Sequence, residues 1–141
     1  KEDGKRVVLL GTEKESELLN RIKNFGQGKT IKIIPPVNLR VLTGLLRKSR
    51  LFIGNDSGMM HLAAMVGVPV LGIFGPGSPD TTGPYMAMEK QEMVTKNFSC
   101  SPCKQRFFKE CKPSPLNKPY CIEDITVKDI HEAVRRLLKR Y

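Results

Sequence analysis

The sequence has few aromatic residues, few histidines and no long apolar run. Aromatic residues make up 6% of the chain, tryptophan is absent and there are two histidines. No run of roughly 18 or more apolar residues occurs, so we expect no membrane-spanning segment. A composition of 40% hydrophobic and 27% charged residues excludes a disordered tail and a collagen-like fibre. The 141 residues match the size of one domain, which is about 100–200 residues.

Signals of export are also lacking. No signal peptide precedes the apolar segments, and the first residue is Lys1 rather than Met, so we expect a piece of a longer protein. We therefore expect a cytoplasmic protein with reduced thiols. A catalytic cysteine is not expected, because neither His61 nor His131 lies in a recognisable nucleophile motif.

The four cysteines follow one another within a short segment near the C-terminus. Their spacing is Cys100-x2-Cys103-x7-Cys111-x9-Cys121. Four thiolates can surround a tetrahedral structural zinc ion, although the second half lacks the paired C-x2-C of zinc ribbons. Structural zinc, disulfides and unliganded thiols therefore remain three alternatives for this segment.

Positive charge is in excess. The net charge is +10, and residues 96–141 hold eleven Lys and Arg against five Asp and Glu. Such a balance points to nucleic acid, anionic lipid or phosphorylated ligands as partners, or to a solvated surface. A basic, zinc-containing nucleic-acid-binding module is one hypothesis, but few aromatic side chains are present to stack on bases.

Apolar strands alternate with amphipathic helices along the first two thirds of the chain. Strands are predicted at residues 6–11, 31–34, 51–54, 69–74 and 92–96. Helices are predicted at about 12–24 and 57–66, and after Asn38, where Leu39, Leu42, Leu45 and Leu46 point one way. Strands that are apolar throughout indicate a parallel sheet covered on both faces. The predicted class is α/β, a Rossmann-like parallel sheet with helices on both faces. Residues 75–91 form a loop long enough to be functional.

The C-terminal third is predicted to be less regular. Residues of about 97–121 form an irregular Cys-rich segment, and Thr126 with Asp129 makes a capping box for a helix at about 126–140.

The segment from Gly54 to His61 carries the strongest functional pattern. A buried strand ends at Gly54, and a helix begins within a few residues. Ligands of parallel sheets bind at the carboxyl ends of strands, and a helix N-terminus suits a phosphate. Gly58 allows a close backbone approach, while either Asp56 or Ser57 caps the helix and the other faces ligand hydroxyls. The alternative is that Asp56 and Ser57 only cap, Gly58 only packs and His61 is an ordinary helix residue.

Several motifs together resemble one enzyme family. They are Asp56-Ser57-Gly58-x-x-His61-x-Ala63, Gly67-x-Pro69, Phe74-Gly75-Pro76 with Pro79, and Leu10 to Glu15. This set is similar to the signature of the ADP-heptose:lipopolysaccharide heptosyltransferases, glycosyltransferase family 9. The cysteines followed by Ile125-Thr126 resemble the heptosyltransferase II branch.

The resemblance implies the C-terminal half of a GT-B glycosyltransferase, so that residues 1–141 form a single nucleotide-sugar donor-binding domain. By matching motif positions, Asp56 would contact heptose hydroxyls, and Ser57, Gly58 and His61 would hold the diphosphate. Glu15 would bind the ribose, with Glu13 and Glu17 as close competitors. Val37 would line the adenine pocket.

The implied reaction is inverting transfer of heptose from ADP-heptose to the lipopolysaccharide inner core. The catalytic base belongs to the N-terminal domain of the same enzyme, so this chain alone is expected to be inactive. His61 is a candidate stabiliser of the leaving group. No cofactor is implied, and the lack of a paired acidic motif agrees with a metal-independent reaction.

The implied partners are the ADP-sugar, the lipopolysaccharide core and the N-terminal domain. Peripheral contact with the anionic inner face of the inner membrane is also expected, and no nucleic acid. A related transferase with another sugar donor is the alternative function.

Overall fold

The computed structural model describes residues 5–26, 30–103 and 111–140. The chain divides into two compact units, Lys1–Leu42 and Thr43–Tyr141, and each is described by itself. The prediction of a single domain over residues 1–141 stays a prediction.

The first unit contains a parallel strand pair and a helix. Strand β1 (Val7–Leu10) pairs with β2 (Ile31–Ile34), in a register that joins Leu10 to Ile34. Between them lie the 3₁₀ turn η1 (Glu13–Glu15) and helix α1 (Ser16–Phe25). Helix α1 packs against β2. Amphipathic spacing explains α1, because its apolar positions recur at helical intervals and Leu19 among them is buried.

Helix α2 (Leu39–Arg47) crosses the division between the units. The sequence predicts its start at Asn38, and the Asn38 side-chain oxygen accepts a hydrogen bond from the Val41 N–H at 3.0 Å. This is the capping interaction expected of Asn, so that prediction is confirmed.

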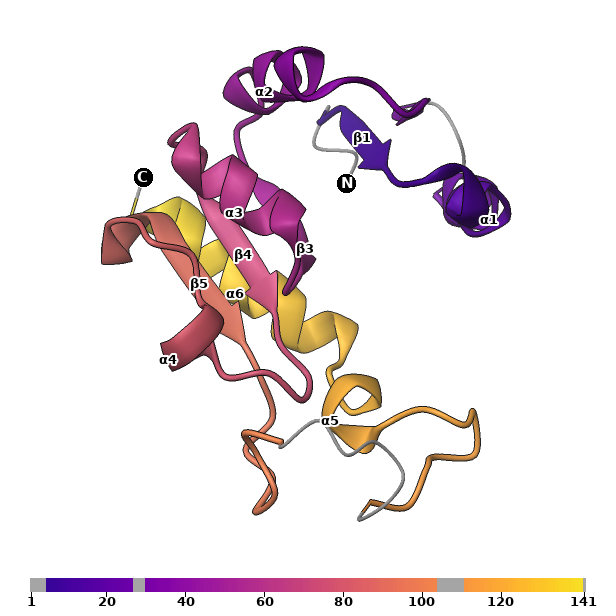
Figure 1. Ribbon diagram of the computed structural model, residues 1–141, viewed down its shortest axis with the longest axis vertical. Coiled ribbons are helices and arrows are strands. Elements are labelled where there is room, and N and C mark those ends of the chain that lie inside the picture. Colours follow the sequence, from indigo (N-terminus) through magenta and orange to yellow (C-terminus); the bar gives the residue numbers. More distant parts are fainter. Residues whose placement is uncertain (1–4, 27–29, 104–110, 141) are drawn as a thin grey trace. The chain divides into compact units, whose positions relative to one another are not determined.

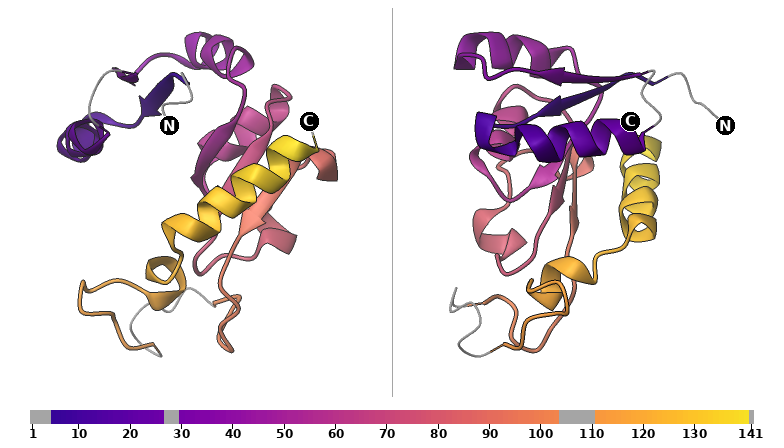
Figure 2. Two further views of the ribbon diagram at one scale, coloured as in Figure 1. Left: turned by 180° about the vertical axis from the view of Figure 1, so that it is seen from behind. Right: turned by 90° about the vertical axis from the view of Figure 1, so that its right-hand side faces the viewer.

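The second unit is a three-layer α/β arrangement. Strands β3 (Phe52–Asn55), β4 (Val70–Ile73) and β5 (Gln91–Val94) pair in parallel in the order β3-β4-β5. Helix α3 (Gly58–Met65) covers one face and α6 (Val127–Lys139) covers the other (Figures 1 and 2). Between α3 and β4, Gly67 has a φ of 81°, the left-handed conformation with which helices commonly end.

The two faces of β4 are filled differently because successive side chains of a strand point to opposite sides. Leu71 packs with Val94 of β5 and with Ala133 and Leu137 of α6, and all four are buried. On the other face Gly72 leaves room for large neighbours, since a Cβ there would lie 2.7 Å from the Met93 sulfur and 3.0 Å from that of Met60. Gly72 is therefore required for packing.

Within each unit the strands pair in parallel, in the orders β1-β2 and β3-β4-β5, as predicted. Two segments differ from the sequence-based prediction. The loop at 75–91 contains the short helices α4 (Pro79–Thr82) and η2 (Met88–Lys90), and the Cys-rich segment contains α5 (Tyr120–Glu123). Hydrophobic periodicity identifies strands but not their pairing, and it cannot detect helices of a single turn.

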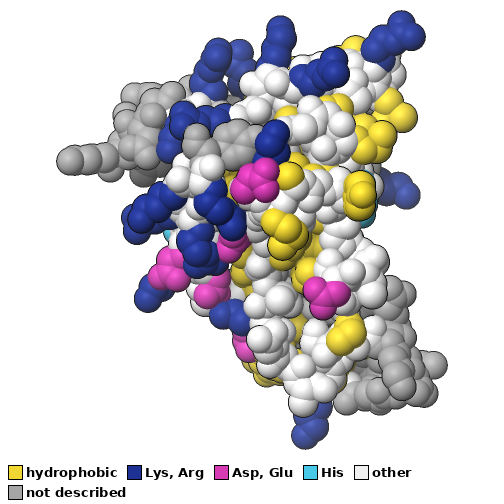
Figure 3. Space-filling view, turned by 90° about the vertical axis from the view of Figure 1, so that its left-hand side faces the viewer, with side chains coloured by type: hydrophobic (Ala, Val, Ile, Leu, Met, Phe, Trp, Pro, Cys, Tyr) yellow, Lys and Arg dark blue, Asp and Glu magenta, His cyan; other side chains and the backbone are white. Residues whose placement is uncertain are grey.

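Charged side chains on the surface are mostly basic. Lys and Arg outnumber Asp and Glu on the face drawn in Figure 3, in agreement with the net charge of +10. Among the described residues, no helix is long and apolar enough to cross a membrane.

Helix α6 begins with the predicted capping box. The Asp129 carboxylate accepts hydrogen bonds from the Thr126 N–H at 2.7 Å and the Thr126 hydroxyl at 2.8 Å. Both bonds go to Oδ2, and the Lys96 ammonium lies 2.9 Å from this same oxygen. The bond from Lys96, followed by those from Thr126, lowers the pKa of Asp129 from 3.8 to about 2. The prediction of a C-terminal helix that starts after Thr126 is confirmed.

We predict a pH-dependent contribution of Asp129 to stability. Because its pKa is lower in the folded than in the unfolded chain, the stabilisation is complete above about pH 4 and is lost as the pH falls towards about 2. The side-chain amide introduced by Asp129→Asn can still accept from Thr126 but has no charge for Lys96. Urea unfolding at a series of pH values should therefore show a difference between wild type and variant that disappears below about pH 2. A difference that persists there would contradict the assignment.

Candidate functional site

The candidate site lies at the carboxyl ends of the strands in the second unit. Asn55 is in register with Ile73, and Ile73 with Val94, so the three strands end at the same edge of the sheet. The chain leaves β3 at Asp56, whose N–H donates to the Ile73 carbonyl at 3.3 Å. Parallel pairing thus brings Asp56 beside the segment that follows β4, as expected for a ligand site in a parallel sheet.

The N-terminus of α3 presents backbone donors at this edge. The N–H groups of Met60 and His61 donate to the Ser57 carbonyl at 3.0 and 3.4 Å. The first N–H groups of an α-helix, here those of Gly58 and Met59, have no partner within the helix. Together with the positive end of the helix dipole, they can accommodate an anionic group.

Gly58 stands in open space. A Cβ at this position would meet no heavy atom within 4 Å, and the residue is exposed. Packing therefore does not require a glycine there, which contradicts the alternative that Gly58 only packs. A glycine without a packing role at a helix N-terminus leaves the backbone open to close approach by a ligand.

Neither Asp56 nor Ser57 makes the predicted side-chain cap. Ser57 occupies the N-cap position with an extended backbone, but its side chain makes no cap hydrogen bond. The Asp56 carboxylate instead accepts a hydrogen bond at 2.9 Å from the Thr82 hydroxyl, at the end of α4. The expectation that either Asp56 or Ser57 would cap α3 is therefore wrong. The Asp56 carboxylate is bonded to Thr82, a residue distant in sequence.

His61 lies one turn into α3 and is half-buried. No hydrogen bond or ion pair holds its imidazole within the described parts of the chain. The structure thus places Asp56, Ser57, Gly58 and His61 on one turn and the helix that follows it.

In the first unit, Glu15 is held at the carboxyl end of β1. Its carboxylate accepts from the Thr12 N–H at 2.7 Å and from the Thr12 hydroxyl at 2.8 Å, and these bonds, the backbone one first, lower its pKa. A Cβ on Gly11 would lie 3.2 Å from the same oxygen. Glu15 is thus the capping-box residue of η1, and the choice among Glu15, Glu13 and Glu17 stays a prediction. Val37 is half-buried and follows β2, so both candidates follow strands that end at one edge.

The four cysteines are unpaired thiols in the second unit. Cys100 is exposed, and Cys103, Cys111 and Cys121 are half-buried. Burial raises the pKa of Cys121, and the three other thiols are near enough to raise it further. Yet within residues 5–26, 30–103 and 111–140, no three His, Cys, Asp or Glu side chains are arranged to hold a metal ion. The zinc hypothesis remains a prediction.

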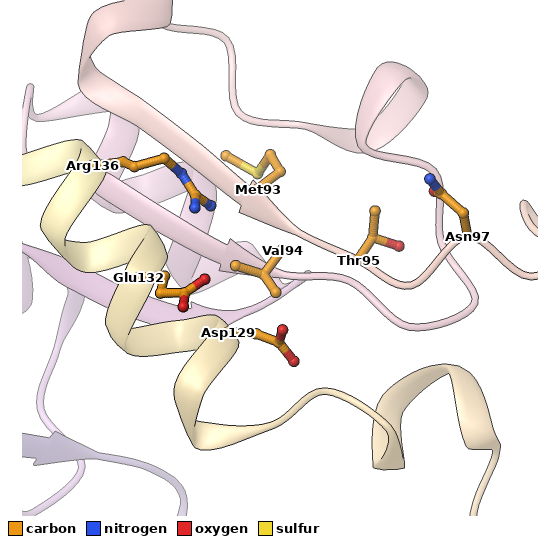
Figure 4. A pocket seen from close by; sticks show the side chains of 7 residues that line it. All are labelled: Met93, Val94, Thr95, Asn97, Asp129, Glu132 and Arg136. Carbon is orange, nitrogen blue, oxygen red and sulfur yellow. The ribbon is translucent and has the colours of Figure 1, made fainter.

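Two pockets flank β5, and they differ in how their polar groups are used. The pocket in Figure 4 lies between β5 and α6, where Arg136 contacts Glu92 at 2.8 Å and Asp129 is engaged by Lys96 and Thr126. The charges of Arg136 and Asp129 are thus already paired within the protein. A second pocket of about 470 Å³ lies beyond the carboxyl end of β5, lined by residues that include Ser78, Asp80 and Phe98.

Thr82 and Gly77 are site residues that sequence reasoning does not single out. Both lie in the loop predicted to be functional at 75–91. Thr82 donates a hydrogen bond to the Asp56 carboxylate, and a Cβ on Gly77 would lie 2.8 Å from the same carboxylate. The length of the loop and its richness in Gly and Pro are the available signal, but they do not indicate which residues reach Asp56.

Comparison with known sequences identifies related proteins. The chain is 32% identical over 137 residues to lipooligosaccharide heptosyltransferase 2 of Campylobacter jejuni, an alignment that covers 94% of this chain and 41% of the relative. It is 31% identical over 87 residues to lipopolysaccharide heptosyltransferase 2 of Escherichia coli, covering 59% and 25%. The chain thus spans about two fifths of the length of the Campylobacter relative.

Two solved structures share the fold. The structure of E. coli ADP-heptose lps heptosyltransferase II matches with a TM-score of 0.73 at 24% identity, over 95% of this chain and 37% of that one. A glycosyl transferase family 9 structure from Veillonella parvula matches with a TM-score of 0.73 at 22% identity, over 98% and 38%. The predicted α/β, Rossmann-like class is confirmed.

A family model decides the relationship. The model described as glycosyltransferase family 9 (heptosyltransferase) matches residues 1–112, which is most of the chain. With the shared fold, this match shows that the chain belongs to glycosyltransferase family 9.

Proposed function

We propose that this chain is the donor-binding part of a heptosyltransferase, the C-terminal half of a GT-B enzyme that moves heptose from ADP-heptose to the lipopolysaccharide inner core. The observation that carries the proposal is the turn after β3, where Asp56 precedes an exposed glycine at the N-terminus of α3. Family membership and the heptosyltransferase names of the relatives support the sugar.

Each part of the donor has a proposed site. The N–H groups of Gly58 and Met59, together with Ser57 and His61, bind the diphosphate. Asp56 binds heptose hydroxyls. In the first unit, Glu15 binds the ribose and Val37 lines the adenine pocket. Support for Glu15 comes from its two bonds to Thr12, which hold one carboxylate oxygen in place at the end of β1.

The chemistry required of this chain is stabilisation of the leaving ADP. In an inverting transfer, a base takes the proton of the acceptor hydroxyl while charge develops on the departing phosphate. Pre-aimed N–H donors stabilise that charge in place, and one such donor is worth about 2.7–4 kcal/mol of barrier. We assign the base to the N-terminal domain, so the isolated chain should bind donor without transferring it. The reaction requires no metal in this proposal.

The basic surface has a role in the same proposal. The acceptor is a phosphorylated lipid in an anionic membrane, and each basic residue near such a surface contributes about 1 kcal/mol to attraction. We propose peripheral contact with the cytoplasmic side of the inner membrane on this basis.

The diphosphate site can be tested at Gly58. A Gly58→Val side chain would occupy the space through which the backbone is reached, so ADP affinity measured by calorimetry should fall by about tenfold or more. The matched control is Gly44→Val in α2, where a Cβ also meets nothing within 4 Å. Equal ADP affinity in both variants would contradict the proposed site. ADP-sugars other than ADP-heptose, tested in parallel, distinguish a related donor specificity.

His61 can be tested in the longer enzyme. A protonated imidazole would favour the leaving diphosphate electrostatically, so His61→Ala should lower kcat by more than about tenfold. His131→Ala changes the exposed histidine of α6 and should leave kcat unchanged. If His61→Ala retains full kcat, the residue is an ordinary member of α3.

The cysteines can be tested by metal analysis and thiol titration. Because the four cysteines are unpaired, we expect protein purified without added reductant to show four titratable thiols. One zinc ion per chain would instead establish a structural site at Cys100, Cys103, Cys111 and Cys121. Fewer than four thiols without metal would indicate disulfides.

A further inference from the structure

The Asp56 carboxylate accepts a hydrogen bond from a residue within the loop that follows β4. The Thr82 hydroxyl donates to its Oδ2 at 2.9 Å, although the two residues belong to different elements. Among the residues that the structure describes, Oδ1 accepts no hydrogen bond, and Asp56 is exposed. One oxygen is therefore engaged by the protein and the other is available.

The Thr82 hydroxyl has a choice of acceptors, since the Ser78 carbonyl lies 3.1 Å away. A threonine hydroxyl has a single proton to donate. The Ser78 carbonyl already accepts the N–H groups of Thr81 at 3.1 Å and Thr82 at 2.9 Å, whereas a carboxylate makes the stronger, charge-assisted bond. We therefore assign the Thr82 hydroxyl proton to the hydrogen bond with the Asp56 carboxylate.

Two glycines allow this contact. A Cβ on Gly77 would lie 2.8 Å from Oδ2 of Asp56, so a larger residue there would shift the carboxylate from its place beside Thr82. At the end of α4 the Gly83 N–H donates to the Pro79 carbonyl at 2.8 Å, and a Cβ there would lie 2.2 Å from that oxygen. Gly83 thereby ends α4 directly after Thr82.

We propose that Thr82 is a positioning residue, which orients the Asp56 carboxylate so that Oδ1 receives a hydroxyl of the donor sugar. The inference rests on the proposed function, because it takes Asp56 as the residue that binds the sugar. Thr82 does not touch the ligand in this scheme. It restricts rotation of a carboxylate that is otherwise exposed, and so reduces the entropy that Asp56 loses when the sugar binds.

The ligand experiment compares ADP-heptose with ADP. Thr82→Val removes the hydroxyl and keeps a branched side chain of similar shape. It should weaken ADP-heptose binding about tenfold by calorimetry while ADP affinity stays unchanged, because ADP lacks the heptose whose hydroxyl Asp56 would bind. Thr82→Ser keeps the hydroxyl and should restore ADP-heptose affinity.

The neighbouring threonine provides a matched control. The Thr81 hydroxyl bonds to the Ser78 carbonyl at 3.2 Å and is exposed on the same helix. Thr81→Val should leave the affinities for both ligands unchanged. Equal loss in Thr81→Val and Thr82→Val would show a general disturbance of α4 and overturn the inference.

A double-mutant cycle tests the contact without ligand. The effects of Asp56→Asn and Thr82→Val on the free energy of unfolding should be non-additive, whereas those of Asp56→Asn and Thr81→Val should add. Additive effects for the first pair would overturn the inference.

The outcomes separate this inference from the proposed function. Wild-type protein that binds neither ADP nor ADP-heptose would overturn the proposed function, and the assigned role of Thr82 in sugar binding with it. Wild-type protein that binds both, with Thr82→Val indistinguishable from it, would overturn only the role of Thr82.

Discussion

The parallel pairing of β3, β4 and β5 is the constraint on which the second unit depends. Parallel strands end at one edge, so the turn at Asp56 and the loop at Gly75–Gly77 meet there although they are distant in sequence. The same pairing gives β4 two buried faces, one filled by α6 and the other by α3. The core and the candidate site therefore depend on the same strand pairing. The register of β3, β4 and β5 packs Leu71 in the core and also sets the position of Asp56 after β3.

The edge of this sheet presents backbone N–H donors and a side-chain carboxylate together. Donor N–H groups at the start of α3 suit the charge of a diphosphate, whereas the carboxylate of Asp56 suits hydroxyl groups. The backbone donors and the carboxylate differ in how rigidly they are held. A helix N-terminus is rigid by construction, but a lone exposed carboxylate rotates unless it is held, and Thr82 supplies that restraint. In the first unit, Thr12 holds Glu15 in a comparable way.

Much of the local structure was predictable. The strands, the helices after β2 and β3, the capping box of α6 and the Asn38 cap follow from apolar spacing and capping chemistry, which are local. The turn from Asp56 to His61 was recognisable because strand, glycine and helix adjoin in sequence. The single-turn helices were not predictable, because one turn is too short for hydrophobic periodicity to reveal. The bond of Asp56 to Thr82, in place of a cap on α3, was not predictable because its partner lies far along the chain.

The sequence by itself determined the α/β class, the family signature and the candidate donor-binding residues, because each depends on short local motifs. Only the tertiary structure decided how those residues are held. It showed that a Cβ on Gly58 would meet no neighbour within 4 Å, and it brought the Thr82 hydroxyl to Asp56. The physical reason is common to these cases: a hydrogen bond or a close contact depends on distances of a few ångströms between elements, and spacing along the chain does not specify them.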